Sequence, residues 1–383
     1  MEKIFDTVDS LYEEYVEFFK EAVAIESPTS YKAGVDAVGN YIAERAEKHG
    51  WKVERAAMEK SGDAVCITMN PEIDAPAICF SGHIDTVHPV GYFGENPVNV
   101  DFEKDRITGP GVEDCKGGIV GAFLAMDALQ RNGYKKRPVK LLLQSDEENS
   151  SATSNKETIK YLCECAKGAV GWINLEPTNG KITVQRKGIL KYKFSVKGKA
   201  RHASTCFDPS CASAINEAAQ KIIELEKNRE PDGLTFSCGL ISGGTAVNTV
   251  PAECEFSFDI RYPDEQAEQK AHEIVKRIAE TSYVNGTSCQ ATLISKRLSM
   301  PYRKENYDLY DKICSAFQKH GLQVMEYESR RGGSDAADVT AYGIPVVDGL
   351  GVRGGGGHTI NEFVTLSSLK TCAKRLCAIA EEI

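Results

Sequence analysis

Apolar residues recur at helical spacing through the first 50 residues and then change to short, separated runs. The helical positions are Ile4, Leu11, Tyr15, Phe18, Phe19, Val35, Val38, Tyr41 and Ile42. Further on, apolar runs bounded by Gly, Pro or Asp predict strands at 64–69, 77–81, 139–145 and 169–175, while helices are expected at 117–132 and 156–166. Short apolar strands that alternate with helices predict an α/β domain whose mostly parallel sheet is covered on both faces.

The pattern changes again after Gly188. Leu190, Tyr192, Phe194 and Val196 alternate with lysines and a serine, which predicts a half-exposed antiparallel strand. The elements expected next are a helix, two strands, a helix and a strand, at 213–227, 235–241, 253–261, 265–283 and 289–295. This β-α-β-β-α-β order is that of the ferredoxin-like unit. We therefore expect a catalytic domain at 1–187 and 298–383, interrupted by an inserted α+β domain at 188–297.

Composition narrows the class of protein. The chain has 383 residues, which favours two domains, and 55 acidic against 46 basic residues give a net charge of −9. This acidic balance argues against a nucleic-acid partner. No apolar run reaches the roughly 20 residues of a membrane span, and no signal peptide is visible. Thirteen cysteines without a CxxC pair indicate reduced thiols, so we expect a cytoplasmic protein.

Several residues capable of metal chemistry follow the apolar strands. His83 and Asp85 come after 77–81, and because residues i and i+2 share a face of an extended chain, Asp85 can support the ring of His83. A turn histidine beside a capping aspartate is the structural alternative. Glu176 ends 169–175, and His358 follows a run of glycines.

Two further acidic positions have structural alternatives of their own. Asp114 directly precedes the helix at 117–132, so it could simply be an N-cap. Glu147 and Glu148 follow 139–145 and could belong to a solvated acidic loop. On an extended backbone, however, adjacent side chains point in opposite directions, so one carboxylate could bind a metal while the other acts as a base.

Taken together, these positions predict a metal centre. Five oxygen or nitrogen ligands without a thiol suit two divalent ions, with zinc the best match and cobalt or manganese as alternatives. Three carboxylates, two Zn²⁺ and one bound hydroxide would bring the site to neutrality. No GxSxG, Walker or GxGxxG motif competes with this interpretation.

The strings SGHIDTV, GPGVEDCKGG, SDEENSS, LEPT and GGGGHTINEF, in this order, resemble the di-zinc aminoacylase/carboxypeptidase family over essentially the whole chain. Glutamate carboxypeptidases, acetylornithine deacetylase, succinyl-diaminopimelate desuccinylase and dipeptidases belong to this family. The resemblance implies that His83 and Glu176 bind different ions, that Asp114 bridges the ions, and that Glu148 and His358 bind together. It also implies that Glu147 is the general base, that Asp85 orients His83, and that the Asp114–Cys115 peptide is cis.

The resemblance assigns further roles to the inserted domain, which would act as a lid and as the homodimer interface. His202 would offer its ring to the substrate carbonyl from the partner subunit of a homodimer. Asn248 and Arg261 would hold the substrate, with Arg261 the candidate for a carboxylate clamp; a solvent-exposed edge arginine is the alternative. The loop with Gly333 and Ser334 would receive the C-terminal end of the substrate.

The expected function is that of a zinc-dependent metallohydrolase that cleaves an amide bond next to a free carboxylate. It would act as a carboxypeptidase or dipeptidase through a metal-bridging hydroxide. One alternative is a deacylase of N-acyl amino acids. A second is a catalytically silent relative that binds amino acids or peptides, although the presence of Glu147 beside all five ligands argues against it.

Overall fold

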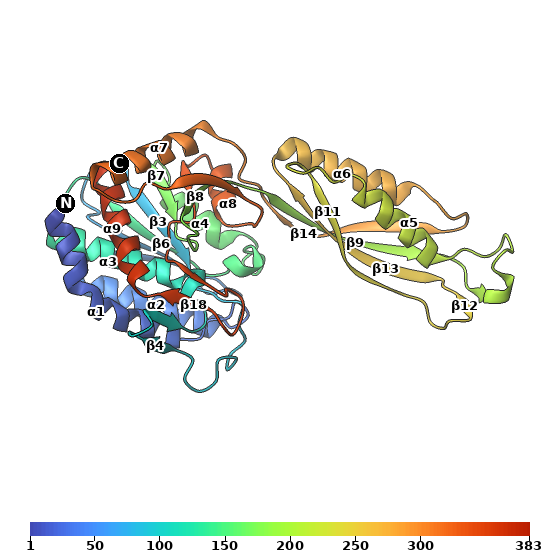
Figure 1. Cartoon of the computed structure of the whole chain (residues 1–383), viewed down its shortest axis with the longest axis horizontal. Coiled ribbons are helices and arrows are strands. Elements are labelled where there is room, and N and C mark those ends of the chain that lie inside the picture. Colours follow the sequence, from blue (N-terminus) through green and yellow to red (C-terminus); the bar gives the residue numbers. More distant parts are fainter. The chain divides into compact units, whose positions relative to one another are not determined.

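The computed structural model describes residues 1–383, and the chain folds into two compact units (Figure 1). Unit 1 comprises Met1–Val184, Tyr302–Glu328 and Ser334–Ile383. Unit 2 comprises Gln185–Pro301 with the short segment Ser329–Gly333. Unit 2 therefore interrupts unit 1 in the sequence. None of the helices is both long and apolar enough to span a bilayer.

Unit 1 is built on a six-stranded sheet with the order β1-β2-β6-β3-β7-β16. The strands are β1 (Lys52–Ala56), β2 (Ala64–Met69), β3 (Ile78–His83), β6 (Val139–Gln144), β7 (Gly171–Asn174) and β16 (Val346–Val347). The β6–β3, β3–β7 and β7–β16 pairings are parallel, whereas β1–β2 and β2–β6 are antiparallel. The sheet is thus mostly parallel, as the apolar strand pattern predicts.

Both faces of this sheet are covered. Helix α3 (Gly117–Arg131) leads from β3 to β6, and helix α4 (Glu157–Cys165) leads from β6 past β3 to β7. The crossover from β3 to β6 runs one way along the sheet, and the crossover from β6 to β7 runs the other way. Because connections between parallel strands are right-handed, this reversal places α3 and α4 on opposite faces of the sheet. Every residue of β2 and of β3 is accordingly buried. The carboxyl ends of β6, β3 and β7 meet at one edge.

The other helices of unit 1 complete its core. They are α1 (Glu2–Ala24), α2 (Lys32–Lys48), α7 (Lys304–Lys319), α8 (Ala336–Ala341) and α9 (Ser367–Glu382). Helices α1, α3 and α9 pack on one another. A smaller sheet has the order β17-β18-β5-β4, and its strands are β17 (Gly354–Gly355), β18 (Phe363–Thr365), β5 (Arg106–Thr108) and β4 (Asn99–Asp101). Strands β8 (Lys181–Arg186) and β15 (Glu326–Arg330) form a separate pair.

Unit 2 contains a four-stranded antiparallel sheet with two helices. The sheet order is β11-β13-β9-β14, from β9 (Gly188–Lys197), β11 (Thr235–Gly243), β13 (Glu253–Tyr262) and β14 (Ser288–Arg297). Helices α5 (Ala214–Glu226) and α6 (Glu265–Glu280) follow β9 and β13, and both pack on the sheet. Alternate residues of β9 and β13 are buried. The element order is therefore the β-α-β-β-α-β order that the polar and apolar alternation predicts.

Two strands of the large sheet, β3 and β16, end where their pairing or their backbone changes. The strand expected at 77–81 continues to His83, because β3 stays paired with β6 as far as the His83–Gln144 pair. The last strand of this sheet, β16, comprises only Val346–Val347. Pro345 lacks an N–H for the ladder, and Gly349 has a φ of 78°, so regular pairing is confined to the two valines.

Candidate metal centre

Three neighbouring parallel strands deliver predicted ligands to one edge of the sheet. His83 is the last residue of β3. Glu147 and Glu148 lie in a 3₁₀ turn, Glu147–Asn149, after β6, and Glu176 lies two residues beyond β7. The expectation that the two glutamates lie on an extended backbone is therefore wrong. The turn is closed by the Ser150 N–H, which donates to the Glu147 carbonyl at 2.7 Å.

Asp114 lies in an irregular turn, Val112–Lys116, rather than at a helix N-cap. Its φ and ψ are −115° and 89°, and the N-cap position of α3 is occupied by Lys116. The Asp114–Cys115 peptide bond is cis, as the resemblance implies. The two carboxylate oxygens of Asp114 face two imidazoles: Nε2 of His83 is 2.9 Å from Oδ1, and Nε2 of His358 is 3.1 Å from Oδ2.

The remaining two carboxylates lie beside these imidazoles. Oε2 of Glu148 is 3.3 Å from Nε2 of His358, and Oε1 of Glu176 is 3.9 Å from Nε2 of His83. His358 enters from the loop between β17 and β18, where its φ is 64°. Asp114 therefore lies between a His83–Glu176 pair and a His358–Glu148 pair. The structure brings together all five residues that the sequence analysis predicts as ligands.

The charges in this cluster shift the pKa values of its members. Burial raises the pKa of Glu176 well above its usual range, and nearby Asp114 and Glu147 raise it further. Burial likewise raises the pKa of Glu148. Burial would also raise the pKa of Asp114, but the hydrogen bonds from His358 and His83 outweigh it and hold that pKa far below its usual range. A site that crowds three carboxylates in this way is suited to cations.

Both imidazoles respond to the same carboxylates. Hydrogen bonds to Asp114 and Glu148 raise the pKa of His358 to about 10. Burial alone would lower the pKa of His83, but Cys115, Asp114 and Asp85 around the ring raise it well above its usual range. The imidazoles thus neutralise carboxylates when no metal is bound. A metal ion would have to displace these protons, since metal-bound imidazole is unprotonated at the ligating nitrogen.

Asp85 supports the site in two ways, only one of which the sequence indicates. Its backbone carbonyl is 2.9 Å from Nδ1 of His83, and its Oδ1 is 3.4 Å from the same nitrogen. Its carboxylate also accepts hydrogen bonds from the backbone N–H groups of Glu147 and Glu148, at 3.1 and 3.2 Å, and from the hydroxyl of Thr29 at 2.7 Å. Asp85 therefore connects the end of β3 to the turn that carries both glutamates.

Cys115 lies near His83 and Glu176, so these three side chains could also be considered as a metal site. Its Sγ, however, accepts a hydrogen bond from the His83 N–H at 3.0 Å and contacts the His83 carbonyl at 3.7 Å. Burial also raises the pKa of this thiol to about 12, which disfavours the thiolate that metals bind. Cys115 therefore packs behind His83.

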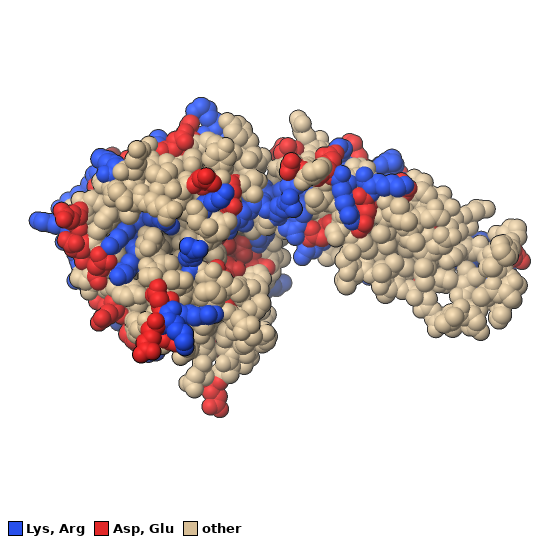
Figure 2. Space-filling model, in the orientation of Figure 1, with Lys and Arg blue, Asp and Glu red and all other residues tan.

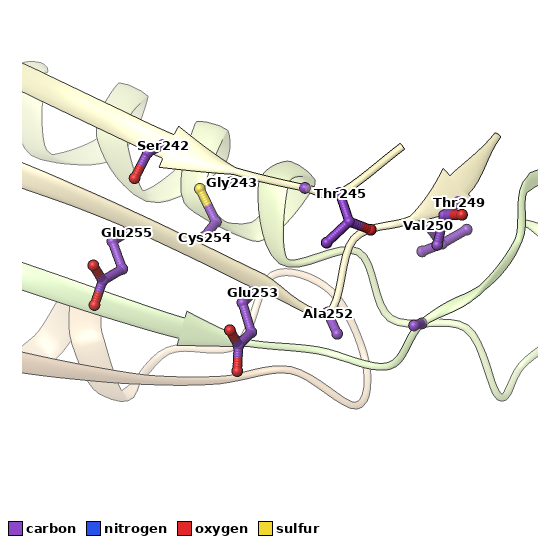
Figure 3. A pocket seen from close by; sticks show the side chains of 11 residues that line it. Ser242, Gly243, Thr245, Thr249, Val250, Ala252, Glu253, Cys254 and Glu255 are labelled. Carbon is purple, nitrogen blue, oxygen red and sulfur yellow. The ribbon is translucent and has the colours of Figure 1, made fainter. Parts of the chain in front are cut away.

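In unit 2 the structure brings His202 and Asn248 close together. The short strands β10 (Arg201–His202) and β12 (Thr249–Val250) pair, with His202 opposite Thr249, and the Ala203 N–H donates to the Asn248 carbonyl at 2.9 Å. A hollow of about 540 Å³ adjoins this loop (Figure 3). Its lining includes β12 and the facing ends of β11 and β13. The His202 ring is exposed, with Nδ1 2.7 Å from the Ser204 hydroxyl.

The other predicted substrate residues already have partners within the chain. Arg261 forms a two-pronged ion pair with Asp259, at 2.6 and 3.1 Å, and donates to the Arg331 carbonyl at 3.0 Å. The Ser334 hydroxyl is buried and donates to Asp348 at 2.6 Å. At Gly333, a Cβ would lie only 2.2 Å from Cδ of Arg297, so any side chain here would displace the Arg297 side chain.

Sequence reasoning missed two residues of this region, Glu362 and His88. Glu362 accepts backbone hydrogen bonds from the turn that carries Asp114, and His88 contacts Glu362. A partial signal exists, because the string HTINE places Glu362 four residues after His358. His88 gives no such signal, since its partner lies 274 positions away.

Comparison with known proteins adds independent information. The model of "Peptidase family M20/M25/M40" matches residues 79–382. The chain is 25% identical to carboxypeptidase G2 of Pseudomonas sp. (strain RS-16), over 92% of this chain and 85% of that protein. It is 26% identical to succinyl-diaminopimelate desuccinylase of Rickettsia felis, over 93% and 96%. The solved structure of aminopeptidase PepT from Bacillus cereus superposes with a TM-score of 0.82 at 22% identity, over 97% and 98%.

Proposed function

The chain belongs to peptidase family M20/M25/M40, and from this we propose that it is a hydrolase with two zinc ions per chain that cleaves the amide bond next to a free carboxylate. The proposed substrates are dipeptides or the C-terminal residues of short peptides. The observation that carries the proposal is the convergence of His83, Asp114, Glu148, Glu176 and His358 at one sheet edge.

The residues present fit divalent ions. All ion pairs of Asp114, Glu148 and Glu176 are with the two imidazoles, and the Glu176 side chain is only 15% exposed, so an uncompensated charge on it is costly. His83 and Glu176 would hold one ion, Glu148 and His358 the other, and Asp114 both. Bound zinc would acidify water and polarise the scissile carbonyl. This donor set, of imidazole and carboxylate, also accepts cobalt or manganese.

Glu147 is the proposed general base. It lies next to Glu148 in the turn, is 7% exposed, and acts electrostatically on both Glu148 and Glu176. A carboxylate at this place can take a proton from the attacking water and pass it to the leaving amine. Asp85 fixes the Glu147 backbone through its hydrogen bond to the Glu147 N–H, which holds the base in place.

Unit 2 is proposed to act as a lid that supplies substrate contacts. His202 would donate to the substrate carbonyl as negative charge develops on it, and Asn248, held beside it, would contact the same substrate. Arg261 would bind the free carboxylate of the substrate, which must then compete with Asp259 for the guanidinium. The backbone at Gly333 and Ser334 would receive the same end of the substrate.

A homodimer through unit 2 is part of this proposal. β11 is an edge strand of its sheet and exposes Leu240 and Ile241, by 71% and 55%, and the neighbouring α5 exposes Ile215 and Ile223. On the face in view, the end of unit 2 around β12 carries few charged side chains (Figure 2). An apolar helix and strand edge can pair with their own copy about a two-fold axis, and His202 would then act in the site of the partner subunit.

A deacylase of N-acyl amino acids is the second candidate, which the similarity to succinyl-diaminopimelate desuccinylase favours. Both activities use the same hydrolytic residues, and substrate preference separates them. The test is to incubate the zinc-loaded protein with dipeptides, N-acetylated dipeptides, dipeptide amides, and N-acetyl and N-succinyl amino acids. Cleavage of peptides but not of their C-terminal amides supports the peptidase. Faster cleavage of N-acyl amino acids supports the deacylase, and no hydrolysis in any series contradicts both.

A further inference from the structure

The carboxylate of Glu362 is buried and accepts hydrogen bonds chiefly from one backbone segment. The residue is 1% exposed. Its Oε1 accepts from the N–H groups of Glu113 and Asp114, at 2.9 and 3.1 Å. Its Oε2 accepts from the N–H of Gly111 at 3.3 Å and lies 3.1 Å from Nε2 of His88. Three of these four partners are backbone groups of the turn that presents Asp114 to the imidazoles.

This turn needs acceptors from outside itself. Gly111 has a left-handed backbone, with φ 70°, and Asp114 and Cys115 have non-helical dihedral angles. The N–H groups at 111, 113 and 114 therefore lack the carbonyl partners that a regular helix would give them, and buried N–H groups require an acceptor. An ionised carboxylate is a strong acceptor for several N–H groups at once. The Glu362 carboxylate thus takes the place of the carbonyl acceptors that a regular helix would provide to these N–H groups.

His88 connects the same carboxylate to the segment after β3. Its ring is buried, stacks on Tyr92 at 5.5 Å between centroids, and meets the edge of Phe93 at 5.0 Å. These contacts fix the ring so that Nε2 faces Glu362. His88 follows His83 by five residues, and Glu362 follows His358 by four. The segments that carry His83, Asp114 and His358 therefore meet at the Glu362 carboxylate.

We propose that Glu362 and His88 are positioning residues of the metal centre, which hold the backbone at Asp114 so that its two oxygens face His83 and His358. Neither residue would contact the ions, and both would act through Asp114. The inference rests on the proposed function, because it requires that Asp114 binds metal. Partners that orient ligands in this manner typically change metal affinity by about 10- to 100-fold when they are replaced.

The first variant is Glu362→Gln in the full-length protein. An amide offers one acceptor oxygen, and its NH₂ group would face a donor of the turn or of His88. The dissociation constant for Co²⁺ is measured by competition with a chromophoric chelator, and the visible absorption spectrum of bound Co²⁺ reports ligand geometry. Glu362→Gln should bind Co²⁺ about 10- to 100-fold more weakly than the wild type and give an altered spectrum.

His88 provides an independent pair of variants. His88→Phe keeps an aromatic ring between Tyr92 and Phe93 but removes the N–H that faces Glu362, so Co²⁺ affinity should fall. His88→Gln keeps an N–H donor and should bind Co²⁺ more tightly than His88→Phe. Tighter Co²⁺ binding by His88→Gln than by His88→Phe supports the inference even when Glu362→Gln is recovered unfolded. Tighter binding by His88→Phe overturns it.

Asp127→Asn is the matched control. Asp127 is also a buried carboxylate beside a histidine, His49, at 3.4 Å, but it lies ten residues along α3 from Gly117, about 15 Å by helical rise. Asp127→Asn should lower the melting temperature without changing Co²⁺ affinity or spectrum. If Glu362→Gln behaves in the same way, Glu362 is only structural and the inference is wrong. A wild-type protein that binds no divalent ion would instead contradict the proposed function itself.

Discussion

Oδ2 of Asp114 lies 3.1 Å from Nε2 of His358, although 244 positions separate the two residues in the sequence. The other oxygen of Asp114 lies 2.9 Å from His83. A carboxylate held between two imidazoles in this way could be shared by two ions, and one imidazole and one further carboxylate would be available to each of them. The first prediction tests this arrangement directly.

Asp114→Asn should abolish tight binding of both ions, because it removes the carboxylate shared between the two halves of the site. Metal analysis after dialysis should find two divalent ions per wild-type chain and at most a trace in the variant. Asp101→Asn, which changes a surface aspartate paired with Lys104, should keep the wild-type metal content. A variant at position 114 that retains both ions would contradict the bridging role.

Glu147 and Glu148 should respond differently to replacement by alanine, although they are adjacent. Glu147→Ala should lower kcat by about 10²-fold or more while both metals remain, as expected when a general base is removed. Glu148→Ala should lower metal affinity, because Glu148 pairs with His358 at the proposed ion. Metal content and turnover are measured on the same preparations. Loss of metal from Glu147→Ala alone would show that the two roles are reversed.

Mixed dimers should test whether His202 acts in the site of the partner subunit. Either Glu147→Ala or His202→Ala should inactivate the homodimer. After subunit exchange, half of the dimers are hybrids with one complete site each, so roughly a quarter of wild-type activity should return. Exchange is verified with differently tagged chains. An exchanged mixture that stays inactive would mean that His202 does not act across the dimer.

The pair of His49 and Asp127 should make stability depend on pH. The hydrogen bond to Asp127 raises the pKa of His49 in the folded protein. The protonated ring therefore stabilises the fold at pH values below the pKa of histidine in the unfolded chain, near 6.5, and this stabilisation is lost as the pH rises through the pKa of the folded state. Burial opposes ionisation of Asp127, but hydrogen bonds from His49 and Arg131 lower its pKa to about 2. The ionised Asp127 therefore adds about 2 kcal/mol to the free energy of unfolding above pH 4, and this stabilisation is lost as the pH falls towards 2.

Urea unfolding at several pH values measures this dependence. Between about pH 4 and 6.5 the difference in unfolding free energy between the wild type and Asp127→Asn should be largest, and it should shrink on either side. Tyr15, whose hydroxyl donates to Asp127 at 3.0 Å, is unchanged in both proteins. A difference that is constant from pH 3 to 8 would show that Asp127 contributes by packing rather than by charge.

Three of the proposed metal ligands could be predicted from the sequence because their positions follow from strand order. His83, Glu148 and Glu176 lie at or just beyond the ends of apolar strands, and parallel strands end at one edge of a sheet. The local conformation at Glu147 could not be predicted, since the 3₁₀ turn depends on hydrogen bonds to Asp85, which lies 62 positions away. Strand length and periodicity carry no information about such contacts.

The same limit explains which elements the sequence analysis missed. β1 has no buried residue and no apolar alternation, so only its pairing with β2 makes it a strand. β17 and β18 are two and three residues long, too short for a periodic pattern, yet they carry the loop with His358. The long alternating strand β9, in contrast, was predicted within two residues of its observed start.

The division of unit 1 into three sequence segments has a consequence for protein synthesis. Residues Met1–Val184 leave the ribosome with four of the five proposed ligands, but His358, Glu362 and helix α9 belong to the last segment, Ser334–Ile383. All of unit 2 is made before that segment. The proposed metal centre can therefore be completed only after unit 2 and then the segment Ser334–Ile383 have been made, so a nascent chain that lacks this last segment has no complete site.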